Sequence, residues 1–334
     1  MTALVAGATG VVGRRLTELL AGAGRQVIGV SRSGTDGTLA VDLADARDCR
    51  DKLGGLAGVT QLFFAAQIPG GDVARNRALL ANLLDQIESP ALAQVHLVHG
   101  TRYYGSHLGP FRTPAREDDP RHDGENFYFE QQDLVTARQA GKNWCWSICR
   151  PHTFCDQLPS GRSLPWLIAG FATILRELGE PLWFPGTAAN YHALYQCTDV
   201  VHLARAIVWM ANEPRCANQV FNITNGAGFR WEQLWPRLAD GFGMAPGPVR
   251  SVRLADFMED KAPVWARAIA RHGLAPTPFA EHALWAYGDY VFTPGWDILS
   301  DTGKIKQFGF SETVDTEAMF RRCFDRFRAD KLIA

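Results

Sequence analysis

Three glycines stand at three-residue spacing near the start of the chain, in the segment GATGVVG. They follow a strand-like stretch, 2–6, and precede an amphipathic helical run, 14–20. A strand that ends at a glycine and restarts as a helix directs backbone N–H groups toward a bound anion. Gly7 allows the tight turn, Gly10 lets a phosphate approach, and Gly13 lets the helix pack on the sheet. The pattern predicts a β-turn-α-β start that binds a dinucleotide, with a plain α/β crossover as the alternative.

The end of the second predicted strand indicates which dinucleotide is bound. An acidic residue there would hold the 2′-hydroxyl of an adenosine ribose. This chain instead has Ser31, Arg32 and Ser33. Because arginine presents paired donors to phosphate oxygens, these residues favour a 2′-phosphate and hence NADPH; the alternative is a solvated surface arginine. Asp42 is expected to end the third strand, where its carboxylate and the backbone of Leu43 are placed to hold the adenine amino group.

Composition favours a soluble enzyme. The chain has 334 residues, 46% of them hydrophobic, with a formal net charge of −1, so nothing favours a nucleic-acid or membrane surface. No apolar run is long enough to span a bilayer, and no leader pattern precedes the first strand, so we expect a cytoplasmic protein. The seven cysteines form no CxxC pair and no cluster with histidine at metal spacing, so we expect reduced thiols and no metal site.

Apolar strands and helical periods alternate through the first half of the chain. Further strands are expected at 26–30, 60–65, 94–98 and 144–149, and helices at 45–53, 71–88 and 129–140. This alternation predicts an α/β fold, a Rossmann-type doubly wound parallel sheet with helices on both faces. Beyond Pro151 loop signals and aromatic residues become dense, which indicates a smaller C-terminal substrate-binding lid. We predict an NADP-binding domain over 1–153 with a returning segment near 190–226, and a lid over 154–189 and 227–334.

The reacting groups should lie beyond the carboxyl ends of the fourth to sixth strands, where ligands bind in such sheets. A short-chain dehydrogenase/reductase normally carries Tyr and Lys four residues apart there, with a Ser or Thr at the end of the fifth strand. Tyr128 stands where the helix begins, but the residue four positions on is Gln132. Tyr104 has no lysine at that spacing either, and Thr101 is the hydroxyl near the strand end. The usual pair is therefore absent.

Several longer segments make the sequence look familiar. HGTRYYG, HLGPF, EDDPR and NFYF, followed by RPHTF, LWFPG, FNITNG and SDTGKIKQFGF, resemble the progesterone 5β-reductase/iridoid synthase-like (PRISE) family. That family is an atypical branch of the extended short-chain dehydrogenases/reductases. The resemblance covers nearly the whole chain, and the combination is specific where each fragment alone is not.

The resemblance implies which residues act. Tyr128 matches the family's catalytic tyrosine, and Arg102 stands where the family has a lysine that replaces the missing one from a distance. Members reduce the carbon–carbon double bond of activated enones or enals with NADPH. The turn motif and the resemblance together predict cofactor contacts at Gly7, Thr9, Gly10, Val11, Val12, Gly13, Ser31, Arg32, Ser33, Asp42, Leu43, Ala65, Ala66, Val98, Tyr128, Pro151 and Phe154.

The chemistry explains why the usual pair is dispensable. Hydride addition to the β-carbon of an enone generates an enolate, so a hydrogen-bond donor aimed at the carbonyl oxygen is the main requirement. Tyr128 can supply it if a nearby cation keeps its pKa low. Arg102 can provide that charge, pair with a carboxylate such as Glu130, or disturb the cofactor ribose. The null interpretation of Tyr128 is an aromatic side chain in a packed NFYF cluster.

Three function classes follow for this chain: an NADPH-dependent ene-reductase acting on a small apolar enone or enal, a carbonyl reductase or sugar-nucleotide epimerase-like enzyme, and a non-catalytic NADP(H)-binding sensor. Aromatic residues of the lid can either line the substrate pocket or pack in the core of the lid. The candidates for lining the pocket are Phe154, Trp166, Trp183, Tyr191 and Tyr195. Asp199 is interpreted as a helix N-cap. We expect a homodimer, with the helices at 71–88 and 129–140 forming a four-helix interface.

Overall fold

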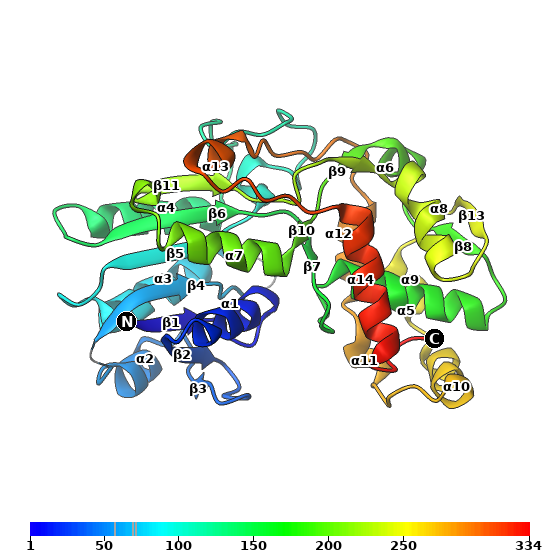
Figure 1. Cartoon of the computed structure of the whole chain (residues 1–334), viewed down its shortest axis with the longest axis horizontal. Coiled ribbons are helices and arrows are strands. Elements are labelled where there is room, and N and C mark those ends of the chain that lie inside the picture. Colours follow the sequence, from blue (N-terminus) through cyan, green and yellow to red (C-terminus); the bar gives the residue numbers. More distant parts are fainter. Residues whose placement is uncertain (57, 69, 71) are drawn as a thin grey trace.

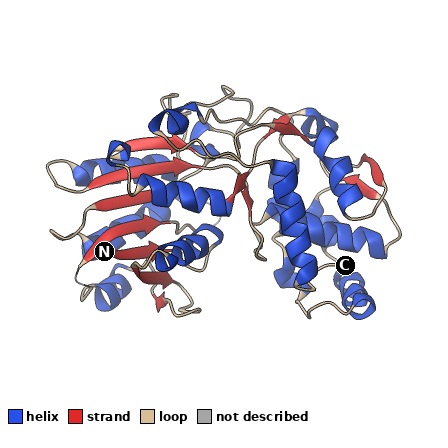
Figure 2. Cartoon of the chain, in the orientation of Figure 1, coloured by secondary structure: helices blue, strands red, loops and turns tan. Residues whose placement is uncertain are grey.

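A parallel sheet organises the N-terminal part of the chain (Figures 1 and 2). The computed structural model describes residues 1–56, 58–68, 70 and 72–334, and within them this sheet has seven strands in the order β11-β6-β5-β4-β1-β2-β3. The strands of this sheet are β1 (Thr2–Ala6), β2 (Gln26–Ser31), β3 (Leu39–Ala40), β4 (Val59–Phe64), β5 (Gln94–Val98), β6 (Cys145–Arg150) and β11 (Gln219–Asn222). Neighbouring strands pair in parallel, so their carboxyl ends share one edge.

Helices cover both faces of this sheet, which confirms the predicted doubly wound fold. On one face α1 (Val11–Gly22) packs against α7 (Val200–Met210), and their apolar sides form one core with the sheet. On the other face lie α2 (Ala46–Leu53), α3 (Val73–Ile87) and α4 (Phe127–Gln139). In Figure 1, α1 and α7 lie in front of the strands and α3 and α4 lie behind them.

Element boundaries differ from the sequence predictions in two instructive places. β3 is only two residues long, so Asp42 does not end that strand; its carboxylate accepts a hydrogen bond from Ala44 N at 2.9 Å and closes the turn into α2. The predicted helix 71–88 begins at Val73 in the described chain, with the Asp72 side chain capping Arg75 N, and Gly71 lies outside the described residues. Local side-chain capping therefore sets both boundaries.

The C-terminal part is a helical lid with short strands. Its long helix α5 (Leu164–Glu177) is buried along its first twelve residues, Leu164 to Leu175, which explains why the segment is apolar all round. Aromatic side chains fill the lid core, among them Trp166, Trp183 and Trp235. Its remaining helices are α6 (Ala188–His192), α8 (Trp231–Gly241), α9 (Leu254–Met258), α10 (Ala262–His272), α11 (Phe279–His282), α12 (Trp285–Phe292) and α14 (Thr316–Ala329).

Five further elements connect these parts, and two small sheets complete the lid. The connecting elements are η1 (Thr101–Tyr104), η2 (Pro214–Cys216), α13 (Gly303–Phe308) and the parallel pair of β7 (Phe154–Cys155) with β10 (Thr198–Asp199). In the lid β8 (Leu182–Phe184) pairs with β13 (Pro246–Val249), and β9 (Leu194–Tyr195) pairs with β12 (Phe229–Arg230). Within the described residues no helix is long and apolar enough to cross a bilayer.

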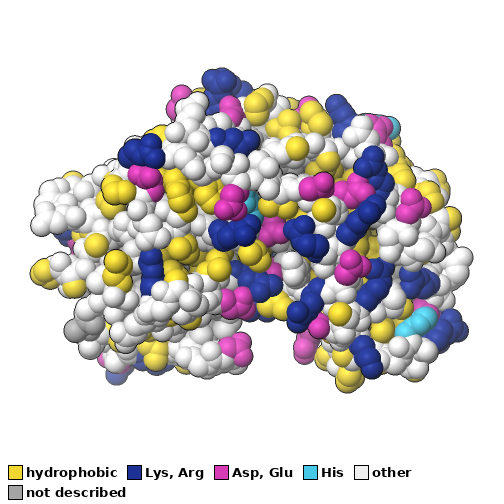
Figure 3. Space-filling view, in the orientation of Figure 1, with side chains coloured by type: hydrophobic (Ala, Val, Ile, Leu, Met, Phe, Trp, Pro, Cys, Tyr) yellow, Lys and Arg dark blue, Asp and Glu magenta, His cyan; other side chains and the backbone are white. Residues whose placement is uncertain are grey.

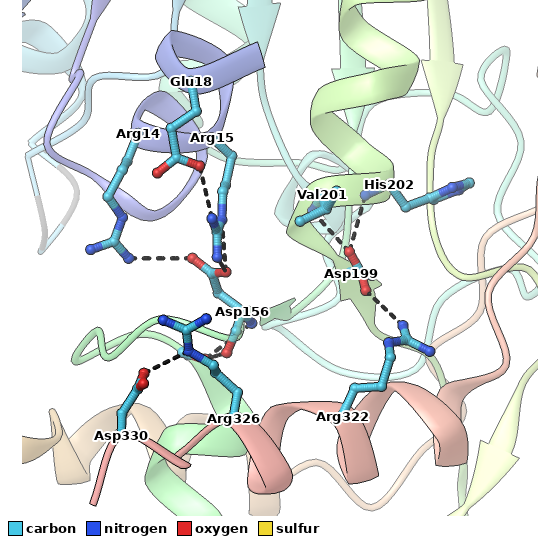
Figure 4. Close-up of polar contacts among 11 residues, drawn as sticks. Arg14, Arg15, Glu18, Asp156, Asp199, Val201, His202, Arg322, Arg326 and Asp330 are labelled. Carbon is cyan, nitrogen blue, oxygen red and sulfur yellow. Dashed lines mark hydrogen bonds and ion pairs between the residues drawn. The ribbon is translucent and has the colours of Figure 1, made fainter. Parts of the chain in front are cut away.

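Ion pairs join the lid to the helices of the large sheet (Figure 4). The buried carboxylate of Asp156, just after β7, accepts hydrogen bonds from Arg15 Nε at 3.0 Å and from Arg14 Nη2 at 3.3 Å, both on α1. Asp199 caps α7 by accepting from the N–H groups of the first turn, as the sequence predicts, and also pairs with Arg322 of α14. The segment that follows β7 is therefore held against α1.

Candidate functional site

The glycine turn between β1 and α1 has the backbone geometry of an anion-binding site. Gly7 adopts a φ of 78°, and a Cβ there would lie 2.9 Å from the carbonyl carbon of Ala65 on the neighbouring strand end. A Cβ at Gly13 would lie 2.1 Å from Gly7 O, so only glycine lets α1 approach so closely. Gly10 caps α1 without a side-chain bond, which leaves the first-turn N–H groups available to a phosphate.

A cavity of about 550 Å³ opens beside this turn, between the carboxyl edge of the sheet and the lid. The space-filling view shows the molecule notched between its two parts (Figure 3). Predicted cofactor contacts on the cavity wall are Gly10, Val11, Val12, Arg32, Ala65, Ala66, Val98, Tyr128, Pro151 and Phe154. The other predicted contacts are not on that wall; they are Gly7, Thr9, Gly13, Ser31, Ser33, Asp42 and Leu43.

The turn after β2 leaves Arg32 as its available polar group. Ser31 is buried, shares a hydrogen bond with Thr38 at 2.7 Å and accepts one from Gly34 N at 3.0 Å, so its hydroxyl serves the turn. Ser33 bonds to the Thr35 hydroxyl at 3.0 Å. Arg32 is exposed at the cavity edge, and in the described part of the chain no ion pair engages it. Its guanidinium is placed to meet an anionic group of a ligand that enters from the glycine turn.

Tyr128 is positioned by the cap of α4. Asn126 Oδ1 accepts a hydrogen bond from Tyr128 N at 3.0 Å, and Asn126 Nδ2 donates to the carbonyl of Arg102 at 2.8 Å. One asparagine therefore fixes both α4 and η1. The Tyr128 ring stacks on His99 with centroids 4.6 Å apart, and a Cβ on Gly100 would lie 3.3 Å from its hydroxyl oxygen. Within the described residues no hydrogen bond engages that hydroxyl, and Tyr128 lines the cavity.

The electrostatics make Tyr128 a donor rather than a base. Burial raises its pKa, and the positive charges of Arg102 and Arg162 oppose that shift without overcoming it. The condition set for Tyr128 in the sequence analysis, a pKa kept low by a nearby cation, is therefore not met, because desolvation outweighs the nearby cations. Burial, together with nearby arginines, lowers the pKa of His99 well below its ordinary value, so the ring stacked on Tyr128 is neutral.

Two other polar residues near this site, Gln132 and Tyr104, accept hydrogen bonds from the buried Arg150. Arg150 Nη2 donates to Gln132 Oε1 at 3.1 Å, and Arg150 Nη1 donates to the Tyr104 hydroxyl at 2.9 Å. Tyr104 in turn donates to Asn222 Oδ1 at 2.7 Å. Neither Gln132 nor Tyr104 reaches the cavity wall, so Tyr104 is a structural residue and Gln132 does not substitute for a lysine.

Arg102 lies on the cavity wall and is exposed. Its suggested partner Glu130 instead lies 3.7 Å from Arg77, measured between Glu130 Oε2 and Arg77 Nε. No ion pair or side-chain hydrogen bond engages Arg102 within the described residues. Its charge is therefore available to the cavity and to Tyr128.

The lid contributes a wall that the sequence prediction missed. Arg162 after β7, together with Leu284, Tyr287 and Tyr290, closes the cavity opposite Tyr128. The two tyrosines are three residues apart on α12 and share a face, which is a detectable pattern. Arg162 lies in a polar loop, where no residue pattern in the sequence indicates that it lines a cavity. Of the aromatic residues that the sequence offers as pocket-lining candidates, Phe154 does line the cavity. The others lie in or against the lid core, namely Trp166, Trp183, Tyr191 and Tyr195.

No metal centre accompanies this site in the described residues, where no group of three or more His, Cys, Asp or Glu side chains converges on a point. The seven cysteines all lie in the described chain and are free thiols. The described wall of the cavity offers arginine, glutamine, histidine, hydroxyl and apolar side chains to a ligand.

Comparison with known proteins places this arrangement in a family. A family model described as a PRISE-like Rossmann-fold domain matches residues 39–334. The chain belongs to this family. It is 31% identical to an (S)-8-oxocitronellyl enol synthase of Antirrhinum majus, covering 99% of this chain and 92% of that protein. It is 32% identical to the short chain dehydrogenase gsfE of Penicillium aethiopicum, covering 82% and 80% of the two chains.

Solved structures with lower sequence identity to this chain than these relatives share its fold. A UDP-glucose 4-epimerase from Thermotoga maritima superposes with a TM-score of 0.68 at 18% identity, covering 98% of this chain and 99% of that one. RMD from Pseudomonas aeruginosa, solved with NADPH, gives a TM-score of 0.67 at 14% identity, covering 98% and 97%. These likenesses support the Rossmann-type doubly wound fold.

Proposed function

We propose that this protein is an oxidoreductase that uses NADPH to reduce the carbon–carbon double bond of activated enones or enals. Family membership supports an enzyme of this class, since relatives at about 30% identity over 99% of the chain are named (S)-8-oxocitronellyl enol synthases. The glycine turn fits a pyrophosphate, and Arg32 at the far end of the cavity suits a 2′-phosphate.

The unengaged hydroxyl of Tyr128 carries the proposal. It stays protonated at neutral pH because burial raises its pKa, and it faces a cavity that begins at the dinucleotide turn. A substrate carbonyl oxygen bound against it receives a hydrogen bond that strengthens as enolate charge develops. The hydride is supplied by the bound cofactor. Tyr128 need not transfer a proton to that oxygen, because the enolate takes the proton that completes the reduction at its α-carbon from water; the missing lysine is therefore not required.

Arg102 adds positive charge beside that oxygen. Neutral His99, stacked behind the Tyr128 ring, and the apolar walls of Phe127 and Phe154 hold the donor in place and limit the water that competes for it. The site is therefore suited to stabilising negative charge on the substrate carbonyl oxygen, and not to delivering a proton to an alkoxide.

Product identification tests the proposal against its alternatives. NADPH consumption is followed with 2-cyclohexenone and with a linear enal, and the products are identified by mass spectrometry and NMR. A saturated ketone or aldehyde is the expected result. An allylic alcohol would instead show a carbonyl reductase, and cofactor binding without turnover would show a sensor.

A further inference from the structure

The cavity wall is unbalanced in charge. Its described residues include Arg32, Arg102 and Arg162 and no aspartate or glutamate. Arg32 lies at the end of β2, where we assign it to the cofactor phosphate. Arg102 and Arg162 remain beside Tyr128, one from the sheet and one from the lid, and both positive charges act on its hydroxyl. A neutral enone would leave the lid arginine without a counter-charge.

Arg162 is held in place but not paired. Gly161 O accepts a hydrogen bond from Leu284 N at 3.1 Å, and Ser163 Oγ bonds the backbone of Asp156 at 3.1 Å, so the residues on both sides of Arg162 are anchored. Arg162 itself is half-buried; its backbone N–H donates to the Ser160 hydroxyl at 3.4 Å, and within the described chain no ion pair or hydrogen bond engages its guanidinium.

The carboxylate of Asp156 does not pair with Arg162. Asp156 follows β7 and its carboxylate already accepts from Arg14 and Arg15, as Figure 4 shows. A partly desolvated guanidinium without a partner is unfavourable, and an anion from outside the chain relieves that cost. On the neighbouring wall Leu284 offers no polar side-chain group, and the Thr153 hydroxyl already shares a hydrogen bond with the Tyr195 hydroxyl at 2.7 Å.

We propose that the substrate of this site is an enal or enone that also carries a carboxylate, which Arg162 binds in a bidentate pair. The inference rests on the proposed function and specifies its substrate class. A single guanidinium matches the two oxygens of a carboxylate, and among the described wall residues Arg162 is the one lysine or arginine from the lid, so a phosphate dianion would find no second lid cation there. The unsaturated end then lies against Tyr128, and the body lies on the apolar wall.

The kinetic test compares an acid with its neutral ester. With NADPH saturating, kcat/KM is measured for 8-oxooct-6-enoate and for its methyl ester. We expect the acid to be preferred about tenfold or more, the range of a charge-assisted hydrogen bond. Arg162→Gln should abolish most of that preference and Arg162→Lys should retain part of it. Arg267→Gln is the matched control, because Arg267 is exposed on α10 away from the cavity. Equal kcat/KM for acid and ester in the parent would overturn the inference.

A binding test separates this inference from the proposed function. Octanoate and octanamide are titrated by calorimetry into the protein saturated with NADP⁺. Tighter binding of octanoate that is lost in Arg162→Gln supports the anion site even if neither unsaturated probe turns over, a result that would refute only the reductase. Equal affinity for the two probes overturns the inference. A parallel loss of NADPH affinity in Arg162→Gln would also overturn it, because Arg162 would then serve the cofactor.

Discussion

Replacing Tyr128 with phenylalanine removes the hydroxyl oxygen but keeps the contacts that hold the residue in place. The ring can still stack on His99, and Tyr128 N keeps its bond to Asn126, because neither contact uses the hydroxyl. Loss of an oxyanion donor costs about 2.7–4 kcal/mol in well-studied enzymes. Since the cavity of about 550 Å³ has room for water to substitute in part, we expect kcat on enones to fall at least roughly tenfold, about 1.4 kcal/mol.

The assay is steady-state NADPH oxidation with an enone, together with NADPH affinity measured by fluorescence. Affinity should change little in Tyr128→Phe, because the oxygen charge exists only in the transition state. Arg102→Lys should keep or raise activity, and Arg102→Ala should lose it. Tyr104→Phe is the control: it should lower stability by about 1–3 kcal/mol, because Arg150 and Asn222 lose a buried partner, with a smaller effect on kcat.

Two results would refute this reasoning. Parent-like kcat in Tyr128→Phe would make Tyr128 structural and would leave the enolate without its assigned donor. Loss of activity in Arg102→Lys would show that the arginine does something a point charge cannot, such as bidentate pairing.

Three further predictions concern the cofactor, pH and assembly. Arg32→Ala should weaken NADPH binding much more than NADH binding in titrations, and equal losses would show that Arg32 does not contact the 2′-phosphate. Because burial raises the pKa of Tyr128, its donor form should persist as pH rises, so kcat should show no tyrosine-type fall below about pH 10; a fall with a lower midpoint would exclude a buried phenol as the donor. Light scattering at micromolar concentration should give a homodimer, with α3 and α4, which pack on each other, at the interface; a monomer mass would reject it.

The local parts of this architecture were predictable from the sequence. Gly7 is required by its φ of 78° in the turn and Gly13 by its close approach to Gly7 O, both within one β-turn-α unit, and Asn126 sets the start of α4 through its own cap, so neighbouring residues contain the information. The same holds for Asp199 as a helix cap. Short-range spacing determines such features because the interacting groups are only a few residues apart.

The assembled wall of the cavity was not predictable in the same way. Arg162 and Tyr287 meet Tyr128 only after the lid folds, across more than a hundred residues of sequence in the case of Tyr287. Aromatic density could not separate Trp183, which packs in the lid core, from Tyr290, which faces the cavity. The pKa shift of Tyr128 is not predictable from the sequence for a related reason: nearby cations can be inferred from a motif, but the burial that outweighs them depends on tertiary packing.

The most direct test of the central claim follows the hydride itself. The enzyme is supplied with NADPH deuterated at the transferable position of the nicotinamide and with a linear enal, and the deuterium in the product is located by NMR. The account predicts deuterium on the carbon β to the aldehyde in a saturated product, because Tyr128 and Arg102 stabilise charge on the oxygen. Deuterium on the carbonyl carbon of an allylic alcohol would contradict it.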